Sequence, residues 1–296
     1  MQKKITMTVL VIIFLLGASL FIYPTVSNWL NQQTQSRAAA NYLEAVRHFK
    51  TEEYQAEKEK AHQYNQWLTE TYSSLNEAVL SEEKNTHSIY KTVLNGGENG
   101  IMGILEIPVI DVYLPIYHGT DDEVLQVGIG HYLGSSMPVG GKSSHAVLTG
   151  HRGLPSAKLL TDIDKMQEKD LFYIHVLDET LTYQVDDIRT VTPLVLESMD
   201  IMRGEDYVTL VTCTPYGINT HRLLVRGKRV PTDEKTAPAM ANVEKQQEEN
   251  DIFAVVFIIV LIVFVTTVSK IRYQRKKHRP SESHEQNKQE ERTGGL

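Results

Sequence analysis

The single cysteine of the chain, Cys213, is the residue best suited to nucleophilic chemistry. It closes the strand-like run TLVTC and is followed by the loop sequence TPYG. Side chains at the end of a strand emerge from a core into solvent, and a nucleophilic thiol needs that exposure and a basic neighbour. A lone thiol is more often a small buried hydrophobe. Its place at the end of a strand favours the nucleophile here.

Histidine is the usual basic partner of a thiol, and the chain contains 11 histidines. Six of them belong to predicted helices, to the basic tail or to the interior of a strand, and the others are His118, His131, His145, His151 and His221. Flanking glycines in the sequence TGHRG let the backbone turn after the strand-like run HAVLT and present the ring of His151. His131, in a glycine-rich stretch, is a weaker candidate for contact with a substrate. The pattern favours His151 and leaves the others open.

Arg222 lies nine residues after the cysteine, within the strand-like run HRLLVRGKRV. Taken alone, an arginine in a strand indicates an ordinary ion pair. Thr212 and His221 alternate to the opposite strand face, so we assign them to support or packing. The chain has no CxxC, no HExxH, no Asp-rich calcium loop and no nucleotide-binding loop, so we expect neither a metal nor a cofactor.

These residues fall in a segment, 101–231, that is predicted to be mainly β. Its short apolar runs are ILEIPVI, VYLPIY, HAVLT, LFYIHV, LTYQV, YVTLVT and HRLLVRGKRV, divided by Gly, Pro and Asp turns. They indicate a barrel or sandwich of about eight strands, and about 130 residues suffice for a single core. Only residues 154–166 are predicted to be helical within this segment.

The segment before the β region, residues 24–100, is predicted to be largely helical. Residues 36–80 lack Gly and Pro, and Tyr42, Ala45, Val46 and Phe49 recur at helical spacing. The aromatic residues in this stripe favour one or two amphipathic helices that pack on the β domain, although a plain stalk is the alternative.

Two uncharged apolar runs, residues 5–23 and 252–268, are predicted to span a membrane. The first is longer than the core of a secretory signal, so an uncleaved anchor is favoured over a cleaved signal. A basic cluster follows the second run, which predicts that residues 1–4 and the tail 269–296 are both cytoplasmic. The β domain would then be extracellular on a two-pass protein, with residues 232–251 as a tether.

The outer segment, residues 24–251, is acidic. It has 20 Lys and Arg against 33 Asp and Glu, a formal charge of −13. Such a surface repels phosphates and argues against nucleic acid as a partner. The lipid bilayer is the partner that the two apolar runs indicate.

Several of these segments resemble sortases. TLVTCTPYGINTHRLLVRGKR and LTGHRGLPSAKLLTDIDKM resemble the cysteine–arginine and histidine segments of that family. EIPVIDVYLPIYHGT and GIGHYLGSSMPVGG are similar to the first strands and following loop of class C, its pilin-polymerising branch. The resemblance covers residues 100–230 and implies a closed eight-stranded β-barrel with a groove for a sorting signal of the Leu-Pro-x-Thr-Gly type.

The resemblance also implies roles. Cys213 matches the nucleophile, His151 the acid/base histidine and Arg222 the arginine that stabilises the tetrahedral intermediate. A thioester formed after cleavage between Thr and Gly would pass to an amine, either a pilin lysine or a cell-wall peptide precursor. Anchoring of single surface proteins to the wall, a noncatalytic peptide-binding scaffold and a hydrolysing cysteine peptidase are the alternatives. The papain-type cysteine signature is absent, which weighs against the last.

One feature of class C enzymes is missing. Their lid carries Asp-Pro followed by an aromatic residue, whereas the corresponding residues 71–92 contain no proline, and the chain has no Asp-Pro pair. We therefore expect at most a lid remnant, using Leu75, His87 or Tyr90. We also expect Cys213 to react with a small disulfide reagent at a rate that hardly depends on this segment.

Overall fold

The computed structural model describes residues 2–81, 89–95, 100–193, 197–233 and 270. Among the described residues, the helices α1 (Gln2–Arg47), α2 (Thr51–Thr71) and α3 (Leu75–Ser81) precede the β domain. The domain contains one short α-helix, α5 (Asp122–Val127), and the 3₁₀ turns η1 (Pro108–Ile110), η2 (Ile163–Lys165) and η3 (Glu197–Met199). Its strands are β1 (Ile101–Ile107), β2 (Val112–His118), β3 (Ile129–His131), β4 (Ser144–Thr149), β5 (Leu171–Val176), β6 (Glu179–Val191), β7 (Asp206–Thr214) and β8 (His221–Val230).

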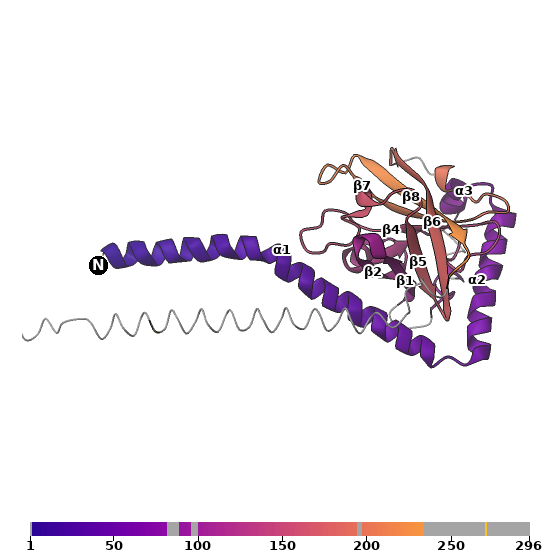
Figure 1. The fold of residues 1–296 in the computed structure, drawn as a ribbon, viewed down its shortest axis with the longest axis horizontal. Helices are drawn as coiled ribbons and strands as arrows, with labels where there is room; N and C mark the ends of the chain where they lie inside the picture. The colour runs from indigo at the N-terminus through magenta and orange to yellow at the C-terminus, as the bar shows by residue number, and fades with distance from the viewer. Residues whose placement is uncertain (1, 82–88, 96–99, 194–196, 234–269, 271–296) are drawn as a thin grey trace, which may run out of the picture. The chain divides into compact units, whose positions relative to one another are not determined.

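The eight strands close into a barrel in the order β1-β2-β3-β4-β7-β8-β6-β5, which confirms the predicted fold (Figure 1). Most neighbours are antiparallel, but β2 pairs with β3 and β4 with β7 in parallel. Parallel neighbours need a crossover, and the one between β4 and β7 contains β5 and β6. The strand that carries Cys213 therefore lies between β4 and β8, in the interior of the sheet.

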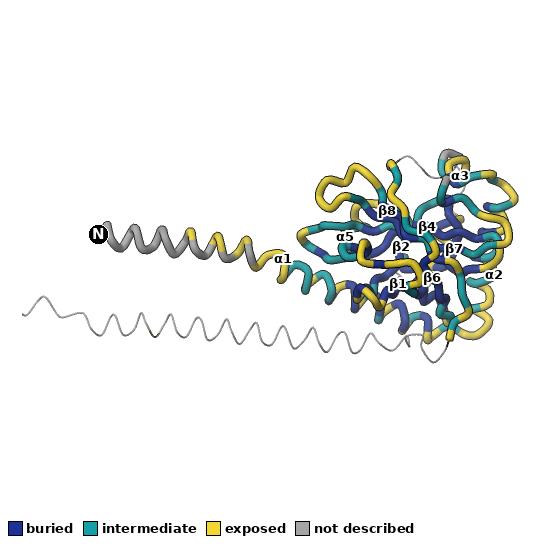
Figure 2. The backbone as a smooth tube through the Cα atoms, turned by 45° about the horizontal axis from the view of Figure 1, so that its top comes forward, coloured by how far each residue is buried: buried dark blue, intermediate teal, exposed yellow. Residues whose placement is uncertain are grey.

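Side chains alternate between the two faces of these strands. On β7, Val208 and Leu210 point into the main core, which α2 and the loop after β4 also help to fill. Val211 belongs to a separate cluster on the outer face, which we call the Leu75 cluster; its buried members are Leu75, Val147, Met199, Val211 and Leu224. Figure 2 shows the strands mostly buried and the connecting loops largely exposed. Because Cys213 is two residues from Val211, it lies on the outer face.

The predicted packing of the N-terminal helices on the barrel is confirmed. On α1 the Tyr42 hydroxyl donates to the Met102 carbonyl at 3.1 Å and accepts from the Leu177 amide at 2.9 Å. On α2 the Asn65 side chain makes two hydrogen bonds to the backbone of Met137. Both helices are therefore fastened to the barrel by specific polar contacts as well as by apolar burial, along different sides of it (Figure 1).

The prediction of a helix over residues 154–166 is wrong. Successive turns with i→i+3 hydrogen bonds replace it, and only η2 is a defined helical turn. Leu159 has a φ of 40°, which interrupts a right-handed helix. The apolar residues of this segment have helical spacing because Leu159, Leu160 and Ile163 are buried in the barrel core. A short helix that the sequence did not indicate, α5, instead lies between β2 and β3.

The segment that contains the first apolar run is part of one helix, α1, which continues without a break through Pro24 to Arg47. Within the described residues, no helix has the length together with the apolar character needed to cross a membrane. The predicted span 252–268 and the tail lie outside the described residues, as does His87. Both spans stay predictions.

Candidate active site

Cys213 is half-exposed at the point where β7 leaves the core. Every residue of the strand from Tyr207 to Thr212 is buried, whereas Cys213 and Thr214 are not. After Thr214 the peptide bond to Pro215 is cis, and a turn closed on the Pro215 carbonyl leads into β8. The thiol thus combines a rigid backbone with access to solvent, as a nucleophile requires.

His151 follows the neighbouring parallel strand, β4. Thr149 pairs with Val211, and extending that register by two residues places His151 level with Cys213. Gly150 fixes this arrangement, because its amide donates to the Val211 carbonyl at 3.1 Å and its carbonyl accepts from the Thr212 hydroxyl at 2.8 Å. Two hydrogen bonds thus hold the backbone just before this predicted acid/base residue against the end of β7, and Thr212 is the support that the alternation predicted.

Gly150 is also needed for packing. A Cβ built on it would lie 2.7 Å from Ile129 and 2.9 Å from Leu160 in the core. A side chain there would force the ends of these two buried side chains to shift. The glycine before the histidine thus admits a close backbone approach.

Arg222 approaches the thiol from the other side of β7. It is the direct cross-strand partner of Cys213 in the antiparallel β7–β8 pair. Its Nη1 donates to the carbonyls of Asn219, at 3.3 Å, and His221, at 3.1 Å, so the guanidinium is held at the end of the strand in a half-buried position. A fixed, permanently charged group beside the nucleophile can stabilise an oxyanion that forms there.

The other candidate histidines have structural roles. His131 is fully buried, contrary to the weaker prediction of substrate contact; it bonds Tyr90 and the Ser136 carbonyl, and burial lowers its pKa to about 4. Burial likewise lowers the pKa of His145 to about 4, and its ring bonds Thr209 and the Asp200 carbonyl. Both rings have their two nitrogens bonded to other groups, so neither is free to serve the thiol.

His118 and His221 are also accounted for. Both ring nitrogens of His118 bond backbone carbonyls, of Gly100 and Val93. The His221 side chain is exposed and bonds the neighbouring Thr220 hydroxyl, so it does not pack, and its support of Arg222 comes from its backbone carbonyl. His145 lies on β4 itself but both of its ring nitrogens are bonded, so His151, two residues after β4, remains the acid/base candidate.

Two further contributors lie near the site, and the first of them, Arg152, was missed by the sequence analysis. Arg152 donates from Nη1 to the Thr214 hydroxyl at 3.3 Å and from Nη2 to Asp164 at 2.5 Å. It therefore ties the histidine loop to the residue after the nucleophile. An arginine next to the candidate histidine was the available signal, but nothing in the sequence showed that its partners would be Thr214 and Asp164.

The second contributor is the Leu75 cluster, which covers the strand face next to the site. Leu75 is buried against Val211 and Leu224, the outward residues two positions from Cys213 and from Arg222, and its amide donates to Asp200 Oδ1 at 2.8 Å. Of the three lid candidates, Leu75 thus packs on this face, whereas Tyr90 is buried beside His131.

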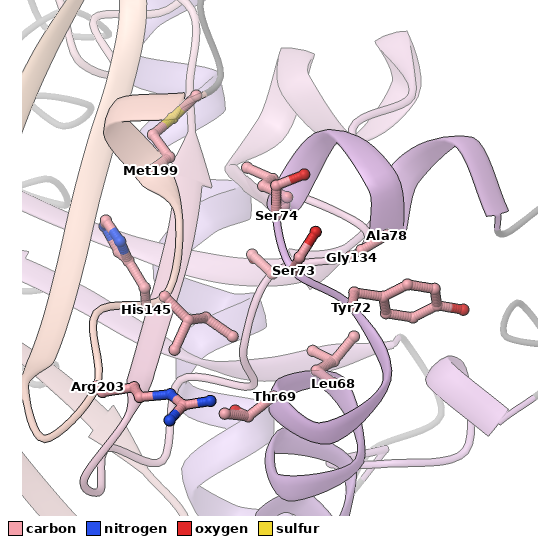
Figure 3. A pocket seen from close by; sticks show the side chains of 13 residues that line it. Leu68, Thr69, Tyr72, Ser73, Ser74, Ala78, Gly134, His145, Met199 and Arg203 are labelled. Atoms are coloured by element: carbon pink, nitrogen blue, oxygen red, sulfur yellow. The ribbon is translucent and has the colours of Figure 1, made fainter.

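A pocket of about 220 Å³ adjoins this cluster, with Leu75 and Met199 in its wall. Figure 3 shows His145, Met199 and Arg203 on one side of it and the connection between α2 and α3 on the other. The α3 segment thus lies over a hollow as well as over an apolar face, so its fit against the strand face near the site is incomplete.

The class of protein is defined by a closed barrel with a thiol at the end of one strand, an arginine paired with it on the next strand and a histidine in the loop that follows the other neighbouring strand. A sequence model of the sortase domain matches residues 105–230. The structure is similar to that of sortase C1 from Streptococcus agalactiae, with 46% identity, a TM-score of 0.63 and coverage of 67% of this chain and 100% of that one. It is also similar to sortase C from Streptococcus pneumoniae, with 43% identity, a TM-score of 0.58 and coverage of 69% and 100%.

Sortase D from Bacillus subtilis is 30% identical over 131 residues, which are 43% of this chain and 63% of that protein. The chain matches about three fifths of the length of this and two other curated relatives, both named sortase A. It belongs to the sortase family, whose members are cysteine transpeptidases.

Proposed function

We propose that this protein is a membrane-anchored cysteine transpeptidase that cleaves a Leu-Pro-x-Thr-Gly-like signal between Thr and Gly and transfers the acyl group to an amine. The observation that carries the proposal is the placement of Cys213 on β7 between Arg222, its partner on β8, and His151 at the end of β4. An acid/base group and an oxyanion donor flanking a nucleophile are the parts that acyl transfer needs.

In the first half of the reaction the Cys213 thiolate attacks the Thr carbonyl. The guanidinium of Arg222 stabilises the oxyanion of the tetrahedral intermediate, and His151 protonates the departing Gly amine. The carbon–nitrogen bond breaks and a thioester remains on Cys213. In the second half an incoming amine gives up a proton to His151 and attacks the thioester, which regenerates the thiol and forms a new amide bond.

The acceptor proposed is a pilin lysine, which would make the protein a pilus-assembly enzyme. The support is the similarity to two solved sortases, the Streptococcus pneumoniae sortase C described with its pilin substrate specificity and the sortase C1 of a pilus island. Anchoring at residues 5–23 and 252–268, with the barrel outside and both termini in the cytoplasm, would hold the enzyme beside membrane-retained substrates and raise their effective concentration.

The test is a mass measurement. The protein is mixed with a Leu-Pro-x-Thr-Gly peptide, and an acyl adduct is expected on the wild type and not on Cys213→Ala, because no other thiol exists in the chain. His221→Ala, at an exposed position next to Arg222, is the matched control and should form the adduct. Adduct and turnover in the alanine variant of Cys213 would remove that residue from the mechanism.

The acceptor is identified from the product. Incubation with the signal peptide, a pilin-derived lysine peptide and a cell-wall peptide precursor should give an isopeptide bond to the lysine peptide. Transfer to the wall precursor instead would make the protein an enzyme that anchors single surface proteins. Release of the free acid alone would make it a peptidase.

A further inference from the structure

The helix α1 contacts the loop that carries His151 through two side-chain amides. Asn28 Oδ1 accepts a hydrogen bond from the backbone amide of Lys158 at 2.7 Å. Asn31 Nδ2 donates to the backbone carbonyl of Ser156, also at 2.7 Å. The two asparagines are three residues apart and therefore lie on one face of the helix. Each partner atom is a backbone group, which fixes the donor and the acceptor in both bonds.

The contacted segment is directly coupled to His151. The segment follows His151 in the chain and contains no strand. It folds back onto the histidine, because the Leu160 amide donates to the His151 carbonyl at 3.1 Å. Arg152 joins its start to Thr214, beside the nucleophile. The loop makes turn hydrogen bonds of its own, as from the Thr161 amide to the Lys158 carbonyl, but it belongs to no strand, so contacts from outside add to those that fix its position.

The contact surface between α1 and this loop is polar. Besides the two asparagines, Gln32, Gln35 and Ser36 face a small hollow of about 30 Å³ shared with Lys158 and Leu159. Specific hydrogen bonds hold such a contact. Replacing one amide nitrogen by a carboxylate oxygen turns a donor into an acceptor, and an attraction then becomes a repulsion. Isosteric substitutions can therefore test it.

We propose that Asn28 and Asn31 are positioning residues for the transfer reaction: they hold the 156–158 segment so that His151 keeps its place beside Cys213. The proposal rests on the proposed catalytic roles of His151 and Cys213. It makes the helix that contains the predicted membrane anchor a part of the catalytic unit, in addition to its role as a tether. Chains that begin after residue 31 would lack both contacts.

The test compares three Asn→Asp variants in the full chain, held in detergent micelles or lipid nanodiscs. Asn28→Asp keeps an oxygen acceptor opposite the Lys158 amide and should lose much less activity than Asn31→Asp. Asn31→Asp places an oxygen against the Ser156 carbonyl, and kcat for acyl transfer should fall about tenfold, the order expected for losing one hydrogen bond and leaving its partner unpaired. Asn41→Asp, at an exposed position of the same helix, has the same change of charge and should match the wild type.

Further readouts separate positioning from general stability. For Asn31→Asp, KM for the peptide should stay within about twofold and a small thiol reagent should label Cys213 at the wild-type rate, because only the acid/base group has moved. Asn31→Ala removes the donor without a charge and should lower kcat about threefold, which keeps the test usable should the aspartate variant fail to fold.

The outcomes are distinguishable. A lower Tm for Asn31→Asp with unchanged kcat would overturn the proposal, because the contact would then only stabilise the fold. Equal losses in Asn28→Asp and Asn31→Asp would overturn it as well, since the hydrogen-bond roles assigned here demand opposite results. Absence of an acyl adduct on the wild-type protein would instead refute the proposed function.

Discussion

Shortening Leu75 to alanine should increase activity toward the signal peptide. An extended peptide rises about 3.3 Å per residue, so one acylated at Cys213 must run over neighbouring surface, and the Leu75 cluster begins two residues, about 7 Å, along β7. Leu75 is buried there against Val211 and Leu224. While α3 is docked, this part of the strand face is closed to a peptide.

The magnitude follows from the burial of Leu75. Replacing a buried leucine by alanine costs about 2–5 kcal/mol, and we take the lower end because the cluster lies on the outer face of the barrel. A shift of about 2 kcal/mol in the docking equilibrium of α3 changes the fraction of open molecules by about 30-fold. The value of kcat/KM for the peptide should therefore rise by tenfold or more in Leu75→Ala.

Two comparisons make this result specific. Asn76→Ala changes an exposed residue of the same helix and should leave kcat/KM unchanged. A small disulfide reagent should label Cys213 at nearly the same rate in all three proteins, because the thiol is half-exposed while α3 is docked. An unchanged kcat/KM in Leu75→Ala would refute the idea that α3 obstructs the peptide, and a decrease would make Leu75 part of the binding surface.

Arg222→Lys keeps the charge but loses the planar fork of donors, so peptide turnover should fall about 10²- to 10³-fold. A rate within twofold of the wild type would show that Arg222 has no role in catalysis. His131 and His145 have a folded-state pKa of about 4 against an ordinary value near 6.5, so only the unfolded chain gains their protons as the pH falls from 6.5. Each histidine should therefore cost about 2 kcal/mol of stability at pH 5, and equal urea unfolding free energies at pH 7 and pH 5 would contradict this. In intact cells a membrane-impermeant thiol reagent should label Cys213 while tags on both termini resist external protease; digestion of the C-terminal tag would show that the span 252–268 or its orientation is wrong.

Local patterning was enough to predict most of the elements. Alternating apolar residues in HRLLVRGKRV mark β8, and the helical stripe through Tyr42 marks the face of α1 that packs on the barrel. Both patterns repeat over a few residues, and each residue's burial is set by its own strand or helix. The same rule failed at residues 154–166, where apolar spacing came from a buried loop whose positive φ at Leu159 no local pattern announces.

The candidate nucleophile was also evident from the sequence by itself, because Cys213 is the only cysteine of the sequence and stands where a strand ends. The choice among five histidines was not evident. It depends on which ring nitrogens are already bonded within the fold, as in His118, His131 and His145, and on the pairing of β4 with β7 across 62 residues. Strand pairs so far apart in the chain form because barrel closure buries the core, so only the tertiary structure decided that Arg222 pairs with Cys213 and that the His151 loop begins beside the same strand.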